Sequence, residues 1–569
     1  MGEDEDKLID ELYKILEETN VWWRDSRWHL KDVDVQAADH SGIKPRILFT
    51  IRDNWLPLIK YRKEWAIRVF RGPRRIGKTT LMKLLIREAI STGFHPRSIV
   101  YISLDNEDLR KIVAKSGLRQ PLRRIISESI EKYGRCILII DEASFHSDWA
   151  LALKNLVDEG VIRYPGVLVL VTGSYSLEFY TAKRELENRM GTLGDDSQGQ
   201  RFLYPLRFVE VVENVSDDIY YYLMNNSFRG RHTLMHRGER LAILEALSEL
   251  RNTAIIKFIE RLWGDIGKNA LDHLEGMYML TGGFPKPIYE LRDQGKVSDD
   301  NYVGFFNLLV SDSGKFELDP EILTDLIKKK LQLPISEHTL SDFQIEVESA
   351  KGSKAVASRK LKPHEAKRYL DYLIEGSRIL FKFKTIRPTS GFKRGFQPFE
   401  SEPQKPFKIV YSDPFIFHSL FWVSQGHTRG VFDAAKDVIS SSRNVRRETD
   451  WKWIIYTHLY EATVCSHVAR ITLLKYGEET SNYGRALHNK GEYADCIVWY
   501  YDSFVGRHHI IPVEVSVTPK TDEVINAAKL TYNNLNRRLI VVSRDELGHI
   551  SGPNYEAVIL PAALFLLFI

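Results

Sequence analysis

Residues 72–80 of this chain are Gly72, Pro73, Arg74, Arg75, Ile76, Gly77, Lys78, Thr79 and Thr80. They form a complete G-x-x-x-x-G-K-[ST] pattern between an alternating apolar segment, residues 64–70, and an apolar run, residues 81–86. In a strand–loop–helix of this kind, backbone N–H groups surround phosphate oxygens and the helix N-terminus adds positive potential. Lys78 would then reach the β- and γ-phosphates of ATP, and the Thr79 hydroxyl would bind Mg²⁺. The stretch therefore predicts a parallel α/β domain with a phosphate-binding loop.

A second apolar strand ends in a pair of carboxylates. Residues 136–140 are a continuous apolar run, typical of a buried parallel strand, and Asp141 and Glu142 follow it. We expect Asp141 to hold the magnesium shell and Glu142 to polarise the water that attacks the γ-phosphate. A third such strand, residues 167–171, precedes Thr172-Gly173-Ser174. Ser174 is a candidate sensor of the γ-phosphate, although an ordinary polar turn explains that segment equally well.

Several further blocks occur in the order that one known family shows. They are Trp22-Trp23-Arg24-Asp25, Val100-Tyr101-Ile102-Ser103-Leu104-Asp105, Arg189-Met190-Gly191, Leu203-Tyr204-Pro205-Leu206-Arg207-Phe208 and Thr281-Gly282-Gly283-Phe284-Pro285. Together with the phosphate loop and the acidic pair, they resemble the archaeal and bacterial AAA+ ATPases of the P-loop superfamily that carry an extra C-terminal domain. The resemblance covers most of the chain.

This resemblance implies a Mg²⁺-dependent ATPase whose site is completed by a neighbouring subunit. Relatives place an arginine in trans against the γ-phosphate, where its fixed fork stabilises developing charge. Arg189 and Arg201 both follow the third strand, and we prefer Arg189 because Arg-Met-Gly resembles the family block. For either residue, a plain surface arginine near a loop is an equally good interpretation. We therefore expect a homo-oligomer, with a hexamer-type ring as one arrangement.

Composition limits the class of protein. The chain has 569 residues, 43% of them hydrophobic, and a formal charge of only +4, so charge matters here through its local distribution. The three cysteines lack metal-type spacing and favour a reducing, cytoplasmic setting. The chain opens on acidic residues instead of a basic and apolar leader. The apolar stretch 557–569 is shorter than the roughly 20 residues of a spanning helix, so we expect a buried terminal element and no membrane association.

Changes in pattern along the chain predict its organisation. We expect an α/β fold in which a P-loop AAA+ parallel-sheet core is joined to a helical lid, a winged-helix domain and a C-terminal α/β nuclease-like domain. An amphipathic helix over residues 1–20 and the Trp-rich segment behind it should pack on the core. The predicted divisions are 1–61 for the N-terminal segment, 62–210 for the core, 211–295 for the lid, 296–425 for the winged helix and 426–569 for the nuclease-like domain.

A basic stretch indicates a nucleic-acid partner, with DNA favoured. Residues 351–394 contain thirteen Lys or Arg and three Asp or Glu, a local charge of +10. A helix beginning near Pro363, followed by an alternating strand over 379–384, suggests a winged helix. Phosphate-contacting candidates on the helix and the wing are Lys367, Arg368, Lys382, Lys384 and Arg387. Two other interpretations remain open, a packing domain with a solvated basic face and a protein-binding winged helix.

The last third contains an incomplete nuclease pattern. In the related ATPases this domain often resembles the PD-(D/E)XK fold, and here Glu461, Asp495 and Glu514 are candidates for one Mg²⁺ site. The position of the family's lysine holds Ser516, so the cation is missing unless Lys520 or Lys490 reaches in. We therefore favour a degenerate domain that holds DNA or is purely structural over one that cleaves it.

These patterns together predict an ATP hydrolase that drives conformational work on nucleic acid, as a remodelling factor or a helicase-type motor. Two alternatives belong to other classes. One is a nucleotide-controlled signalling or defence switch that acts on a protein partner, and the other is an ATP-gated nuclease. ATPase rates with and without DNA, and strand cleavage that Asp495→Ala abolishes, distinguish the three.

Overall fold

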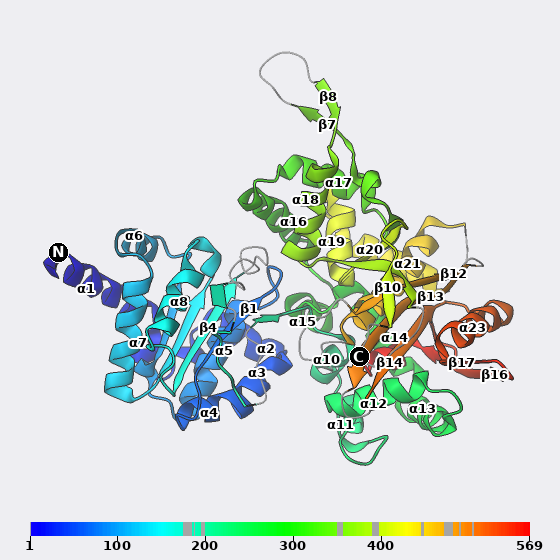
Figure 1. The fold of residues 1–569 in the computed structure, drawn as a ribbon, viewed down its shortest axis with the longest axis horizontal. Helices are drawn as coiled ribbons and strands as arrows, with labels where there is room; N and C mark the ends of the chain where they lie inside the picture. The colour runs from blue at the N-terminus through cyan, green and yellow to red at the C-terminus, as the bar shows by residue number, and fades with distance from the viewer. Residues whose placement is uncertain are drawn as a thin grey trace. The chain divides into compact units, whose positions relative to one another are not determined.

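The structure is a computed structural model of the 569-residue chain. It describes residues 2–173, 185–186, 188–194, 200–349, 357–389, 398–444, 449–471, 482–488, 491–502 and 506–569. The chain divides into two compact units (Figure 1), Met1–Tyr204 with Glu375–Ser377 and Pro205–Ile374 with Arg378–Ile569. Each unit has a large β-sheet of its own.

The first unit is built around five parallel strands. They are β1 (Ala66–Arg71), β2 (Ile99–Ser103), β3 (Cys136–Asp141), β4 (Val167–Gly173) and β5 (Gln200–Phe202). Their order in the sheet is β2-β3-β4-β1-β5, and every neighbouring pair is parallel. This confirms the predicted parallel core. Because the carboxyl ends of parallel strands meet at one edge, the phosphate loop after β1 and the acidic pair after β3 share that edge, with β4 between them.

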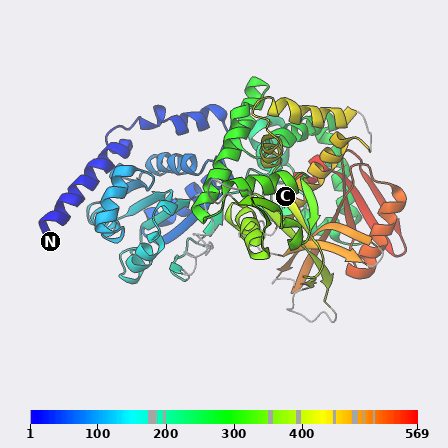
Figure 2. The same ribbon diagram turned by 90° about the horizontal axis from the view of Figure 1, so that it is seen from above.

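Helices cover both faces of this sheet, as Figures 1 and 2 show. The helices of the first unit are α1 (Gly2–Thr19), α2 (Val33–Ser41), α3 (Arg46–Thr50), α4 (Leu56–Lys60), α5 (Lys78–Ser91), α6 (Glu107–Ser116), α7 (Arg119–Tyr133) and α8 (Trp149–Asp158), with short helical turns η1 (Val21–Trp23), η2 (Trp28–Leu30), η3 (Ile51–Trp55), η4 (Pro96–Ser98) and η5 (Ala143–Phe145). One apolar core joins α1, α6, α7 and α8 to the sheet, and a second joins α2 and α5. Buried strands with cores on both faces explain the continuous apolar runs in the sequence.

The N-terminal segment packs on the five-stranded parallel core, as predicted. Leu12 and Leu16 on α1 are buried in the first core. The indole N–H groups of Trp22 and Trp23 both donate to the carbonyl oxygen of Ile99, at 3.1 and 2.9 Å. The side chain of Asn20 exchanges two hydrogen bonds with the backbone of Tyr101. Since β2 is the edge strand, this segment covers backbone groups that would otherwise stay open to another chain.

A helical region opens the second unit. Its helices before the second sheet are α10 (Phe208–Val215), α11 (Asp217–Asn225), α12 (Arg237–Ser248), α13 (Thr253–Ile266), α14 (Lys268–Thr281), α15 (Pro285–Gln294), α16 (Asp299–Ser313) and α17 (Pro320–Lys330), with the turn η6 (Gly314–Phe316). Caps mark many of the boundaries: the Asp319 side chain accepts from two backbone N–H groups at the start of α17, and Pro320 is its first residue.

The second unit contains a ten-stranded mixed sheet. Its strands are β6 (Ile335–His338), β9 (Leu380–Pro388), β10 (Phe399–Ser401), β11 (Phe407–Tyr411), β12 (Tyr483–His488), β13 (Gly491–Asp502), β14 (Arg507–Val515), β15 (Leu539–Ser543), β16 (Gly548–Gly552) and β17 (Tyr555–Pro561). The order is β16-β17-β15-β14-β13-β12-β9-β11-β6, and β10 pairs with β9. The hairpin of β7 (Glu346–Ser349) and β8 (Ala357–Lys360) is separate and projects from this unit (Figure 1).

The remaining helices come from several parts of the chain. They are α18 (Pro363–Asp371), α19 (Pro414–Ser424), α20 (Val431–Asn444), α21 (Trp451–Ala469), α23 (Thr521–Leu535) and α24 (Ala562–Leu566), with the turns η7 (Leu340–Phe343) and η8 (Tyr372–Gly376). The orange-to-red strands β13 to β17 lie beside α23 in Figures 1 and 2, and α23 shares an apolar core with β15 and β17. Residues 557–569 are buried here, as predicted for the apolar end of the sequence.

The second unit differs from the predicted organisation. The strand expected in a winged helix is β9, and β9 pairs with β12 in parallel and with β11 in antiparallel. The expected boundary at 425/426 therefore runs through one continuous sheet, because backbone pairing joins segments that are a hundred residues apart. The compact units also separate at 204/205, a few residues before the predicted end of the core at 210.

Within the described residues, no helix is long and apolar enough to cross a bilayer. The three cysteines are buried free thiols, and the sulfur atoms of Cys465 on α21 and Cys496 on β13 lie 2.8 Å apart.

Candidate nucleotide-binding site

The phosphate loop takes its shape from two glycines with different roles. Gly77 has φ +90° and caps α5, a left-handed conformation that side chains disfavour. Gly72 is needed for space instead, because a Cβ atom there would lie 2.5 Å from the carbonyl oxygen of Leu203. The backbone N–H of Leu203 donates to Arg71 at 2.7 Å, so the chain after β5 lies against the base of the loop.

Lys78 is held over the loop by neutral acceptors. Its ammonium donates to the carbonyl oxygens of Gly72 and Pro73, at 2.9 and 3.0 Å, and the residue is only 6% exposed. Phosphate oxygens are charged acceptors and form stronger hydrogen bonds to an ammonium than carbonyl oxygens do. The arrangement therefore keeps a buried cation next to the place where the sequence predicts the phosphates.

Asp141 lies at the centre of the hydroxyl groups of the site. Its Oδ2 atom accepts from the Thr79 hydroxyl at 2.8 Å and from the Tyr101 hydroxyl at 2.7 Å. Its Oδ1 atom accepts from the Thr172 hydroxyl and from the backbone N–H of Glu142, the latter at 3.0 Å. A threonine hydroxyl beside a carboxylate is a hard oxygen donor pair of the kind that Mg²⁺ prefers, so the residues present fit that ion.

Tyr101 is a residue of this site that the sequence did not indicate. Burial and the Asp141 carboxylate raise the pKa of its phenol well above the ordinary value, so it stays a hydrogen-bond donor. The available signal was a single tyrosine in the otherwise apolar second strand. Its ring also contacts Trp22, at 6.4 Å between centroids, which connects the N-terminal segment to the acidic residue of the site.

Glu142 occupies a left-handed backbone conformation, with φ +49° directly after β3. Such a conformation costs a non-glycine residue energy, and it is found preferentially at functional sites. The residue is half-buried at the same sheet edge as Lys78. Thr172 and Gly173 end β4 beside it, whereas Ser174, the predicted γ-phosphate sensor, lies outside the described residues.

Arg189 lies at the amino ends of the parallel strands, whereas the phosphate loop lies at their carboxyl ends. Its guanidinium donates to Asp158, at the end of α8, at 2.8 Å. The following residues Met190 and Gly191 lie against the first residues of β1, whereas the phosphate loop follows the last residue of β1. Six residues of strand span about 16 Å. Arg189 is therefore remote from the phosphate loop of its own chain, and Gly191 has a packing role, because a Cβ atom there would lie 2.3 Å from a backbone oxygen of Trp65.

Two sequence blocks of the family pattern meet in the second unit. The backbone N–H of Leu206 donates to Gly283 at 2.9 Å, and a Cβ atom on Gly283 would lie 2.0 Å from the Leu206 oxygen. The N–H of Gly283 in turn donates to Asp413 at 2.8 Å. Burial raises the pKa of Asp413 to about 7. Gly283 is thus required by a close backbone approach, whereas Gly282 has φ +52° and lies against the Asp413 side chain.

The nuclease-type residues lie together in the second unit, around a lysine that the sequence reasoning missed. Lys408 on β11 lies 2.7 Å from Asp495 on β13 and 3.0 Å from Glu461 on α21. The Asp495 carboxylate also accepts from the backbone N–H of Val515 at 2.8 Å. Glu514 is on the neighbouring strand β14. Lys408 comes 53 residues before Glu461, in a segment expected in another domain, so spacing carried no signal for it.

Of the two lysines expected as substitutes for the missing cation, one lies in the described part of the chain. Lys520 pairs with Glu523 at 3.4 Å on the surface, and Lys490 lies outside the described residues. Burial and the adjacent Asp495 raise the pKa of Glu461. Burial alone would raise that of Asp495 too, but Lys408 outweighs it and the pKa is lowered.

The predicted nucleic-acid residues divide into two groups. Lys382 and Lys384 on β9 lie near Lys367 on α18, which begins at Pro363 as predicted. Burial, Lys384 and Lys367 lower the pKa of Lys382, although Asp371 opposes them. The two arginines are engaged by neighbours instead. Arg387 donates to Glu400 across the β9–β10 pair at 2.7 Å, and Arg368 donates to the carbonyl oxygen of Phe316 at 3.0 Å.

Comparison with known proteins identifies the domain that carries the phosphate loop. Residues 64–212 match the family described as an AAA domain. The protein is thus an AAA-domain ATPase, an enzyme that hydrolyses ATP. A search of the curated proteins returned no match.

Several solved structures are similar to this chain at low identity. A Walker-type ATPase of Pyrococcus abyssi is 12% identical, with a TM-score of 0.34 over 64% of this chain and 94% of that one. The ORC1 protein of Aeropyrum pernix in complex with DNA is 11% identical, with a TM-score of 0.24 over 70% and 93%. PCH-2 of C. elegans is 16% identical, with a TM-score of 0.21 over 32% and 48%. Likenesses this distant carry no argument about function.

Proposed function

We propose that this ATPase uses Mg²⁺-dependent hydrolysis of ATP to drive conformational work on nucleic acid, with DNA as the favoured partner, in the cytoplasm. Thr79 and Asp141 would hold the magnesium ion, Lys78 the phosphates, and Glu142 the attacking water. The hydrogen bond of 2.8 Å between Thr79 and Asp141 supports the first assignment, since an ion bound there would take up the same two oxygens.

The nucleic-acid role rests on one observation, the cluster of Lys367, Lys382 and Lys384. Two separate elements, α18 and β9, bring these ammonium groups close enough that Lys384 and Lys367 lower the pKa of Lys382. Three ammonium groups lie near one carboxylate, Asp371, so the cluster keeps a net positive charge, and a row of phosphates would supply the counter-charge. The Lys382 ammonium also lies 3.9 Å from the centre of the Phe407 ring, which holds it in place.

The test is the salt dependence of DNA binding. Each phosphate contact contributes about −0.9 to the slope of log K against log salt on duplex DNA. Replacing Lys367, Lys382 and Lys384 together by glutamine should flatten that slope by up to about 3. Fluorescence anisotropy with labelled duplex and single-stranded DNA measures it, and ATP hydrolysis without DNA should survive the change.

The matched control is the double variant Arg368→Gln and Arg387→Gln. Both arginines belong to the same basic stretch but contact protein oxygens, so their loss should change the slope by less than the lysines do. An unchanged slope in the lysine variant would remove these residues from nucleic-acid binding. ATP-driven switching on a protein partner would then be the better function, with turnover independent of DNA.

We propose further that Arg189 acts in a neighbouring subunit of a homo-oligomer. Its distance from its own phosphate loop supports a role in trans, and the ion pair with Asp158 is exposed enough to exchange partners at an interface. Mixing Arg189→Ala subunits with Lys78→Ala subunits tests this, because only some interfaces then pair an intact arginine with an intact loop. A turnover curve that equals simple dilution would contradict sharing.

For the C-terminal region we propose a structural or DNA-holding role without cleavage. The Lys408 ammonium lies in contact with both Glu461 and Asp495, which a catalytic Mg²⁺ would need as ligands. Incubation of the protein with plasmid and branched DNA, with Mg²⁺ and ATP, should leave the strands intact. Cleavage that Asp495→Ala abolishes would establish the ATP-gated nuclease instead.

A further inference from the structure

A second group of side chains lies on one face of strands β13 and β14 of the ten-stranded sheet. In the antiparallel pair β13–β14, Tyr500 lies opposite His509 and Asp502 opposite Arg507. Side chains alternate along a strand, so Tyr500, Asp502 and His509 share one face while Trp499 points to the other. Trp499 packs in the core that includes Leu530 of α23. Helix α12 packs on β14, and it brings Glu245 to the group.

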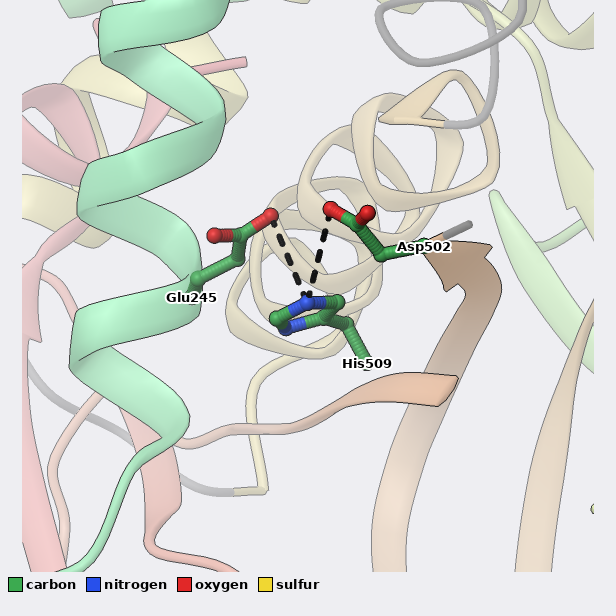
Figure 3. A group of neighbouring side chains, drawn as sticks. All are labelled: Glu245, Asp502 and His509. Carbon is green, nitrogen blue, oxygen red and sulfur yellow. Dashed lines mark ion pairs between the residues drawn. The ribbon is translucent and has the colours of Figure 1, made fainter. Parts of the chain in front are cut away.

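The side chains of Glu245, Asp502 and His509 point at one another (Figure 3), but they make no hydrogen bonds among themselves. The Nε2 atom of His509 lies 3.9 Å from Glu245 Oε1 and 3.9 Å from Asp502 Oδ2. These distances are too long for hydrogen bonds. The His509 residue is 5% exposed, and its Nε2 atom has no hydrogen-bond partner among the described residues. A buried polar atom of this kind needs a partner, because leaving it unsatisfied costs free energy.

The charged groups around His509 also favour the binding of a cation. Burial lowers the pKa of His509, and Arg507 adds to this effect while the two carboxylates oppose it. Both carboxylates have side chains that are only 13% exposed. Two carboxylates with little access to water lie beside one imidazole nitrogen, with Arg229 on the other oxygen of Glu245, and a group of this kind favours a bound cation.

The two flanking groups position the ligands. The Tyr500 hydroxyl donates to Glu245 Oε1 at 2.9 Å, and the Tyr500 ring stacks on the His509 ring at 5.4 Å between centroids. Arg229 lies 3.7 Å from the other oxygen of Glu245. Contacts of this type orient metal-binding side chains and restrict their rotation.

We propose that Glu245, Asp502 and His509 bind one divalent transition-metal ion of the Zn²⁺ type, which fastens α12 to the β13–β14 hairpin. The ligand atoms lie within 4.8 Å of one another. Bonds of about 2.1 Å place two ligands of a tetrahedral ion roughly 3.4 Å apart. The two pairs that include His509 Nε2 would need to close by about half an ångström, and the pair of carboxylate oxygens by up to about 1.4 Å. Three protein ligands leave the fourth position to water.

The donor set separates this ion from the magnesium of the nucleotide site. One imidazole nitrogen with two carboxylate oxygens suits Zn²⁺ or Mn²⁺, whereas Mg²⁺ prefers oxygen ligands and keeps several waters. The ligands come from residues 245, 502 and 509, which are brought together only by folding. Bound metal should therefore raise the melting temperature of the protein.

The experiment titrates the full chain with Zn²⁺ after treatment with a chelator and gel filtration. Asp141→Asn serves as the background, so that the nucleotide site does not contribute an ion. We expect one equivalent of bound zinc, measured by competition with a chromophoric chelator, and an increase in melting temperature. Glu245→Gln, Asp502→Asn and His509→Asn should each lower the affinity by tenfold or more.

The control is Glu249→Gln, one helical turn beyond Glu245. Glu249 accepts from Arg507 at 2.8 Å, so it is an acid in the same region that does not face His509. Its variant should keep the affinity of the parent. Co²⁺ substitution gives a second readout that needs no variant, because a nitrogen ligand produces a visible absorption spectrum distinct from that of the ion in water. Absence of bound zinc, equal affinity in all variants, or binding that survives His509→Asn would each overturn the proposal.

Discussion

The two units each bury a lysine beside acidic residues, but the hydrogen-bond partners of the two lysines differ. Lys78 in the first unit donates to two carbonyl oxygens of its own loop, while Asp141 nearby bonds to hydroxyl groups. Lys408 in the second unit bonds directly to Asp495 and Glu461. Carbonyl oxygens carry no net charge, so a phosphate can replace them at small electrostatic cost. Carboxylates that lose their cation stay behind as buried charges.

This difference bears on the role that we propose for each site. In the first unit, a phosphate and a metal ion would replace the carbonyl and hydroxyl groups that now contact Lys78 and Asp141. Where the cation and the carboxylates neutralise one another, their charges contribute to the fold. The two sites contain similar residue types, and only their hydrogen-bond partners distinguish them.

The largest expected effect is on turnover at the nucleotide site. Glu142→Gln should keep ATP binding and lose about 10²–10⁴ in the rate, because the amide cannot accept a proton from the attacking water. Lys78→Ala should lose ATP affinity instead. Steady-state phosphate release and binding of a fluorescent nucleotide separate the two results. Normal turnover in Glu142→Gln would remove this residue from the catalytic role.

The second effect tests whether Lys408 is structural. Lys408→Met should lower the free energy of unfolding by about 3–5 kcal/mol, because the Asp495 carboxylate is left uncompensated in a buried place. Adding Asp495→Asn to this variant should recover part of the loss. Urea unfolding gives the stability, and ATP binding by the folded fraction should stay unchanged. If Lys408→Met left the free energy of unfolding unchanged, the difference drawn here between Lys78 and Lys408 would be wrong.

A third effect concerns pH. The folded protein raises the pKa of Glu461 above the ordinary 4.5 through burial and Asp495. Folded Glu461 thus holds a proton that the unfolded chain has already lost. Its contribution to stability is complete below about pH 4.5 and decreases as the pH rises through the folded pKa. Urea unfolding between about pH 5 and pH 8 should show a smaller decrease for Glu461→Gln than for the parent protein.

The smallest effect is expected at Tyr101. Tyr101→Phe keeps the ring contact with Trp22 and removes the hydroxyl that donates to Asp141 at 2.7 Å. The loss should be about 1 kcal/mol in stability, with turnover changed by a few-fold. Thermal unfolding and steady-state kinetics measure both. A loss of turnover as large as that of Glu142→Gln would place Tyr101 among the catalytic groups.

Local patterns were sufficient for the first unit because its chemistry is local. The loop 72–77 connects β1 to α5, and Lys78 and Thr79 are the first residues of α5. Asp141 is the last residue of β3 and Glu142 follows it directly. The carboxyl ends of parallel strands meet at one edge, so these two segments must lie near one another. The apolar runs predicted the buried strands for the same reason, since a strand covered on both faces has no polar side.

The second unit contains contacts that local sequence patterns do not predict. No spacing indicates that β9 pairs with β12, and this pairing places a segment expected in a winged helix inside a ten-stranded sheet. Lys408, Glu461 and Asp495 come from three separate elements, as do the two strands and the helix around His509. Contacts of this kind depend on strand pairing and helix packing between distant segments.

By itself, the sequence determined the phosphate loop, the acidic pair and the parallel α/β core, because each follows from residues close together in the chain. Only the tertiary structure decided which charges are neutralised and which remain available. It paired Lys408 with two carboxylates, engaged Arg387 with Glu400, and left the Nε2 atom of His509 facing Glu245 and Asp502. Electrostatic energy depends on distance and burial in space, and neither is written in the order of the residues.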